Sequence, residues 1–240
     1  MFTSKLLFAL VASALVLFFL PSAPAQAADC YKIATTAGTG GTGEIAQIAR
    51  HVFEAAGLCV EMIRLPPKRI EAMAELRQVD GWVQAISAAD IPRGMILVPH
   101  DLGHLEGTLY WASDVPEPTG SRAVIGVVLG QTWAQGEVSR RRSKLYEVRD
   151  NKQLLSMAVE QRIQGFLVPA ITYRHFLAKF PELRGYRSRF VSDLPIRLAL
   201  NAGLESVAQR LDIAAEQTMT GDYPAQVWGK YLQELPPEVH

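Results

Sequence analysis

Residues 31–81 constrain the fold of this chain more than any other stretch. A run rich in β-forming residues (31–36) leads into a glycine-rich turn (38–43). The apolar residues that follow have the spacing of an amphipathic helix that ends at Gly57. A second strand-like run comes next, and then a helix that opens with two prolines. This order of strand, helix, strand and helix predicts parallel strands in a sheet that is covered by helices.

The first 28 residues have the pattern of an export signal rather than of a folded element. Lys5 precedes an apolar run (6–20), which is followed by Pro21 and by a small-residue site of the A-x-A type that ends at Ala27. An uncleaved anchor helix is the other interpretation, but the run is short for a membrane span of about 20 residues. The sequence predicts cleavage near Ala27 and a mature protein outside the cytoplasm.

The balance of charges limits the kinds of molecule that the protein is expected to bind. The chain has 24 Lys and Arg against 24 Asp and Glu, so no global field favours nucleic acid or a membrane surface. No second apolar run approaches the length of a membrane span. The length after the leader suits either two small lobes or one large domain.

The two cysteines stand at the starts of the first two predicted strands. In a parallel strand pair, Cys30 and Cys59 would lie side by side at one end of the sheet. An oxidising compartment would permit a disulfide between them, although two buried thiols are the alternative. We expect the disulfide.

A second block of strands and helices begins after an exposed, linker-like segment at residues 113–120. Its predicted strands include 123–129, 145–148, 163–168 and 186–191, with helices between them. A further strand at 194–201 and two helices close the chain. The sequence therefore predicts two α/β blocks and a tail that docks on one of them.

The glycine-rich turn admits two interpretations. It satisfies G-x-G-x-x-G between a strand and a helix, with Glu61 at about the distance of a ribose-binding acid, which is typical of a dinucleotide site. Export argues against a nicotinamide cofactor. The backbone N–H groups of the turn would then face another anionic or strongly accepting ligand, or the glycines would serve only a tight turn.

Several motifs, in order, resemble the family 3 extracellular solute-binding proteins, the periplasmic receptors of ABC importers. The first block carries L-P-P-K-R at residues 65–69, V-D-G at 79–81, and a loop with Ser87 and Arg93. The second carries I-G-V-V-L-G-Q-T at 125–132, and the end of the chain matches at 196–201 and 211–231. The resemblance covers nearly all of the predicted mature chain.

This resemblance implies a type 2 periplasmic-binding fold, with two α/β lobes, two crossovers and a ligand between the lobes. Lobe one would comprise residues 29–112 and 194–240, and lobe two residues 113–193. The crossovers would fall near residues 111–113 and near Asp193.

The resemblance also implies a ligand site. Arg93 matches the residue that clamps a ligand carboxylate in a bidentate manner, and Ser87 matches the hydroxyl beside it. Thr132 matches the helix start of the second lobe. The expected ligand-binding residues are Gly40, Gly41, Thr42, Ser87, Arg93, Gln131 and Thr132.

The chain departs from the family where amino-acid binders carry an acid for the ligand ammonium, because it has F-L-V-P at residues 166–169. The aromatic residue usual after the first strand is absent, and the loop between Ser87 and Arg93 is one residue off the usual spacing. The expected solute is small and polar, with an acidic or hydroxylated end and no ammonium.

No enzymatic motif stands out. The chain has no G-x-S-x-G, H-E-x-x-H or P-loop, and His100, Asp101 and His104 form no familiar metal-ligand spacing. Together with the resemblance, this leads us to expect a monomeric binding protein without metal or cofactor, which serves an ABC importer or a signalling partner. The alternatives are an exported enzyme of the dehydratase type on the same fold, or a dinucleotide binder.

Overall fold

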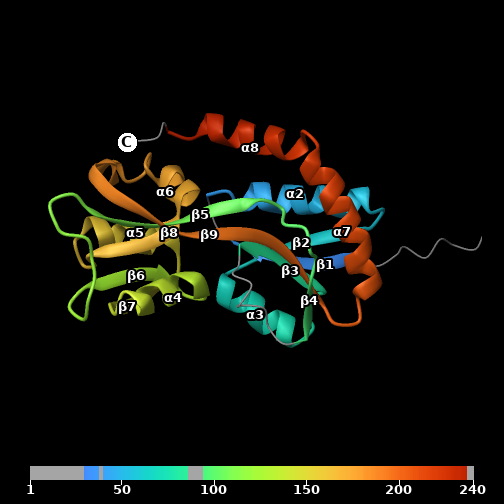
Figure 1. The fold of residues 1–240 in the computed structure, drawn as a ribbon, viewed down its shortest axis with the longest axis horizontal. Helices are drawn as coiled ribbons and strands as arrows, with labels where there is room; N and C mark the ends of the chain where they lie inside the picture. Colours follow the sequence, from blue (N-terminus) through green and yellow to red (C-terminus); the bar gives the residue numbers. More distant parts are fainter. Residues whose placement is uncertain (1–29, 38–39, 86–93, 237–240) are drawn as a thin grey trace, which may run out of the picture.

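A computed structural model describes residues 30–37, 40–85 and 94–236, which form two lobes side by side (Figure 1). The predicted leader and two of the predicted ligand residues, Ser87 and Arg93, lie outside the described residues. Within the described ranges, no helix combines the length and apolar character needed to cross a membrane.

Lobe one is built on the strand and helix order expected from residues 31–81. Strand β1 (Tyr31–Thr36) pairs in parallel with β2 (Val60–Leu65) and with β3 (Gly81–Ala85). The last part of β9 (Tyr186–Asn201) joins this sheet in the antiparallel direction, next to β3, and β4 (Met95–Leu97) also pairs with β9. The strands of the whole molecule run in the order β2-β1-β3-β9-β5-β8-β6-β7.

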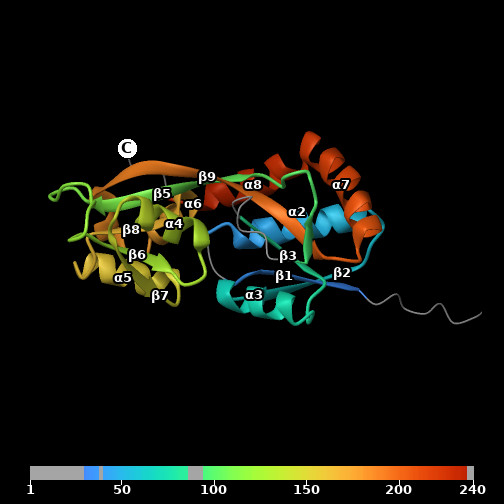
Figure 2. The ribbon, with the colours of Figure 1, turned by 60° about the horizontal axis from the view of Figure 1, so that its bottom comes forward.

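Helices cover both faces of the first sheet (Figure 2). On one face, α2 (Thr42–Ala55), α7 (Glu205–Thr220) and α8 (Tyr223–Glu234) bury a core that includes Ile48, Phe53 and Leu211. On the other face, α3 (Pro67–Glu75) buries Ile70 against Trp82. This double cover explains why β1 and β3 are apolar in their central residues.

Lobe two contains β5 (His104–Ala112), β6 (Val124–Val128), β7 (Lys144–Val148), β8 (Gly165–Pro169) and the first part of β9. Helix α4 (Thr132–Arg140) lies on one face of this sheet. Helices α5 (Asn151–Val159) and α6 (Ala170–Phe176) lie on the other, followed by the 3-10 helix η3 (Pro181–Gly185). The two helical layers enclose two separate apolar clusters.

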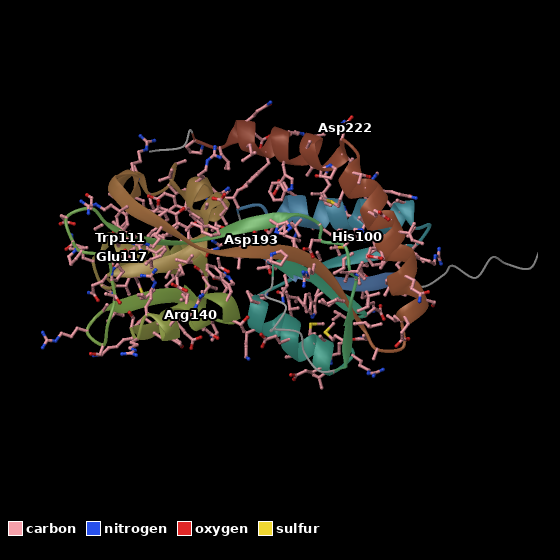
Figure 3. All side chains as sticks on the ribbon, in the orientation of Figure 1. His100, Trp111, Glu117, Arg140, Asp193 and Asp222 are labelled. Carbon is pink, nitrogen blue, oxygen red and sulfur yellow. A yellow bond between two sulfur atoms is a disulfide. The ribbon has the colours of Figure 1, made fainter. Side chains whose placement is uncertain are left out.

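The lobe boundary expected after Ala112 differs from the strand pairing. Strand β5 pairs with β8 and with the first part of β9, so residues 104–112 belong to the second sheet. The resemblance implied a crossover near residues 111–113, but the polar segment at 113–120 follows β5 and leads into β6 of the same sheet, so it is a surface connection within lobe two. There, Glu117 forms ion pairs with Arg141 at 2.6 Å and with Arg189 at 2.6 Å (Figure 3).

The two strands predicted at 186–191 and 194–201 are one strand. Strand β9 continues through Asp193 and takes part in both sheets, pairing with β5 in lobe two and with β3 in lobe one. Asp193 lies midway along the molecule, where β9 passes from one lobe to the other (Figure 3). The strand can remain continuous because it keeps one direction along its length and only its neighbouring strands change.

The expected disulfide is confirmed: Cys30 and Cys59 are bonded, with Cα atoms 4.6 Å apart. The parallel register of Tyr31 with Val60 places the residues before each strand side by side.

Candidate ligand cleft

A cavity of about 110 Å³ lies between the lobes. From lobe one it is lined by the end of β1, the start of α2 and the end of β3, including Thr35, Thr42 and Gln84. From lobe two it is lined by the residues around the starts of α4 and α5, including Thr132 and Asn151. Ligands of open α/β sheets bind outside the carboxyl ends of the strands, and this cavity has that position.

Three helices begin with a polar residue at the cavity wall. Thr42 is the first residue of α2, Thr132 the first of α4 and Asn151 the first of α5, and all three line the cavity. Helix N-termini carry unpaired N–H groups and partial positive charge. The cavity is therefore suited to a group that accepts hydrogen bonds or carries negative charge.

The glycine-rich turn lies where the lobes meet. Gly40 has a φ of 88°, and a Cβ on it would lie 2.6 Å from the Cα of Thr172, on α6 of lobe two. Gly41 has a φ of 90°, and a Cβ on it would lie 3.1 Å from the ring of Trp228 on α8. Close packing against lobe two and α8 thus accounts for these two glycines without a nucleotide.

Comparison with solved structures defines the fold. The ligand-binding core of GluR0 in complex with L-glutamate matches with a TM-score of 0.71 at 15% identity, over 86% of this chain and 99% of that one. The substrate-binding protein of an amino acid ABC transporter matches with a TM-score of 0.70 at 12% identity, over 85% and 100% of the two chains. The chain has the two-lobe periplasmic-binding fold.

A third structure of this fold is an ancestral amino acid-binding protein, AncCDT-1, described as a precursor of cyclohexadienyl dehydratase. It matches with a TM-score of 0.66 at 12% identity, over 84% of this chain and 94% of that one. No protein-family model matches the sequence, and no curated protein matches it.

The lobes of this periplasmic-binding fold touch at both sides of the cleft. On one side, the Thr172 hydroxyl donates to the Gly40 carbonyl oxygen at 3.4 Å. On the other, a Cβ on Gly130 would lie 2.9 Å from the backbone nitrogen of Lys68. The two walls of the cleft therefore touch each other on both sides.

The cleft brings together four of the residues expected from the sequence. Gly40, Thr42, Gln131 and Thr132 line the cavity, whereas Gly41 is buried beside it, under Trp228. Ser87 and Arg93 remain sequence predictions.

Sequence reasoning missed several cleft residues. One of them is Asn151, which follows the helix cap Asp150, whose side chain accepts from the Gln153 N–H at 2.8 Å. Thr172 and Trp133 also line the cavity, at the first turns of α6 and α4. Their position at helix starts facing the other lobe is the signal that could have identified them.

One carboxylate, that of Glu71, is found among the described residues that line the cavity. Its Oε2 atom lies 2.8 Å from the Nζ of Lys68, and this hydrogen bond raises the pKa of Lys68. Glu71 therefore already has a cationic partner on α3.

The histidines near the start of β5 are held by carboxylates. His100 Nδ1 lies 2.7 Å from Asp212, and this hydrogen bond raises the pKa of His100. His104 Nδ1 lies 2.8 Å from Asp193. In the described part of the chain, no three His, Cys, Asp or Glu side chains are grouped as a metal site would need.

Proposed function

We propose that the protein is a periplasmic solute-binding protein that holds a small polar solute between its lobes for an ABC importer or a signalling partner. The observation that carries this proposal is the interlobe cavity with three helix starts in its wall. The likeness to the ligand-binding core of GluR0 and to the substrate-binding protein of an amino acid ABC transporter supports the role at the level of the fold.

The solute is expected to carry an acidic or hydroxylated end. Helix N-termini at Thr42 and Thr132 favour such a group electrostatically. The resemblance in the sequence adds Arg93 and Ser87 as the clamp for a carboxylate.

The first test is a thermal-shift screen of the purified protein, followed by calorimetry, with small carboxylic acids, hydroxy acids, amino acids, amides and polyols. A ligand at 100 times its Kd should stabilise the protein by about 2.7 kcal/mol. If no compound raises the unfolding temperature, the proposal fails.

The predicted clamp is tested with Arg93→Ala. Because the predicted contact is charge-assisted and bidentate, its loss should lower the affinity for a carboxylate-bearing solute at least about tenfold. Arg187→Ala, at an exposed position of β9 in lobe two, is the matched control and should bind as the wild type does. Unchanged affinity in Arg93→Ala would remove Arg93 from the site.

A dehydratase-like enzyme is the second candidate, because one structure of the same fold is a precursor of such an enzyme. Mass spectrometry of the solute after incubation with the protein distinguishes the two roles. Loss of the mass of water would indicate the enzyme, and an unchanged mass the binding protein.

A further inference from the structure

Two side-chain oxygens in the lobe-two wall of the cleft are buried without a hydrogen-bond donor. They are Oε1 of Gln131 and Oδ1 of Asn151, and both residues line the cavity. A buried acceptor that lacks a donor costs about 1–3 kcal/mol, so buried acceptors are normally satisfied by protein, by water or by a ligand.

Neither oxygen is used to cap a helix. Gln131 precedes α4, and its side chain makes no capping hydrogen bond there. Asn151 is the first residue of α5, but Asp150 caps that helix, through its bond to the Gln153 N–H. The local structure therefore leaves both oxygens available to the cavity.

We propose that Gln131 and Asn151 form a subsite of the cleft for an uncharged hydrogen-bond donor of the solute, a hydroxyl or an amide N–H. This inference rests on the proposed function and specifies which part of the solute lobe two recognises.

The charge of the groups that line the cavity disfavours a cationic donor at the subsite. An ammonium group here would face the N-terminal ends of α4 and α5, which carry partial positive charge. Glu71 is already paired with Lys68, and Pro169, which ends β8 at the cavity, supplies no charge. A hydroxyl group suits both features, because it donates to the side-chain oxygens and accepts from helix N–H groups.

The first experiment measures binding with matched solutes. Carboxylic acids of three to six carbons are compared in sets that differ only in a hydroxyl, an amide, an ammonium or a hydrogen at one carbon. In the set that binds with the highest affinity, we expect the hydroxyl or amide member to bind at least about tenfold more tightly than the ammonium and hydrogen members. Equal binding of the hydrogen member, or tighter binding of the ammonium member, would overturn the inference.

The second experiment reverses the preference of the subsite. Asn151→Asp and Gln131→Glu keep the size of each side chain but introduce a carboxylate, which should favour an ammonium donor. Acidic residues are favourable at helix N-termini, so both variants should fold. The affinity ratio of hydroxyl to ammonium members should fall at least about tenfold in each variant.

Gln209→Glu is the matched control, since it makes the same change at an exposed position of α7. It should leave the ratio unchanged. A ratio that stays at the wild-type value in Asn151→Asp and Gln131→Glu, with circular dichroism showing both to be folded, would contradict the subsite.

The outcomes separate this inference from the proposed function. If solutes bind equally well with and without the hydroxyl or amide donor, the subsite is refuted and the solute-binding role is not. Failure of every solute to bind would refute both.

Discussion

At the scale of single residues, Gly40 determines how closely the lobes approach. Its backbone has a left-handed φ of 88°, and its missing Cβ leaves room for Thr172 of the opposite lobe. A glycine is required here for two reasons, backbone conformation and close approach, and both follow from its position between the lobes.

We expect Gly40→Ala to separate the lobes. The new methyl group would lie 2.6 Å from the Thr172 Cα, and movement of lobe two relieves that clash without unfolding either lobe. The variant should therefore have a larger radius of gyration than the wild type in small-angle X-ray scattering.

Gly120→Ala provides the control for backbone strain. Gly120 has a φ of 80°, and no atom lies within 4 Å of where its Cβ would be. Strain of about 1–3 kcal/mol should destabilise both variants, but the radius should change only in Gly40→Ala. Superimposable scattering curves for Gly40→Ala and the wild type would contradict this account.

At the scale of elements, helix α8 contacts both lobes. It packs on α2 in lobe one and extends toward α6 in lobe two (Figure 1). At the lobe-two end, the Tyr231 hydroxyl lies 3.2 Å from Nδ1 of His175, and an Arg174 Nη2 donates to the Pro236 carbonyl oxygen at 3.2 Å. The final helix thus adds a contact between the lobes besides the continuous strand β9.

The contact between α8 and α6 should weaken in acid. Burial, followed by the nearby charge of Lys179, lowers the pKa of His175 below its ordinary value of about 6.5. The folded protein therefore favours neutral His175. Its stabilising contribution is complete above about pH 6.5 and is lost as the pH falls toward the lowered pKa.

The measurement is the unfolding temperature of the wild type and of His175→Gln between pH 5 and 8, where glutamine stays neutral and can still meet Tyr231. The wild type should lose more stability than the variant on acidification. Equal slopes for His175→Gln and the wild type would show that His175 does not contribute.

At the scale of the whole molecule, two lobes share one continuous strand and one cleft. Strand β9 takes part in both sheets, and the cavity gathers side chains from residues 35 to 172 of the sequence. A cleft assembled from both lobes is consistent with a protein that encloses its ligand.

We predict that the leader is removed on export, by cleavage after Ala27 or after Ala28. The intact mass and the N-terminal sequence of protein from the periplasmic fraction should correspond to a start at Ala28 or Asp29. Ala27→Arg should block cleavage, because the A-x-A site requires small residues, whereas Gln26→Arg changes only the middle position and should be processed. A full-length chain in the periplasm would contradict the prediction.

Much of the fold was predictable because it depends on local periodicity. The strands and helices of residues 31–81 follow from apolar spacing and from Gly57 and the proline pair, and the disulfide follows from the parallel pairing of two strands. The sequence interpretation placed residues 104–112 in lobe one, whereas strand β5 pairs with β8 and with the first part of β9. The sheet to which β5 belongs depends on pairing with strands that are far away in the sequence, and local composition does not indicate that pairing.

The sequence by itself determined the order of the elements, the turn at Gly40 and the helix starts at Gln131 and Thr132, since each depends on neighbouring residues. The tertiary structure alone decided that Asn151 joins them at one cavity, and that two buried oxygens there lack donors. The physical reason is that burial and hydrogen bonding depend on which surfaces meet. The surfaces that form this cleft come mainly from two separate parts of the chain, residues 35–85 and residues 130–172.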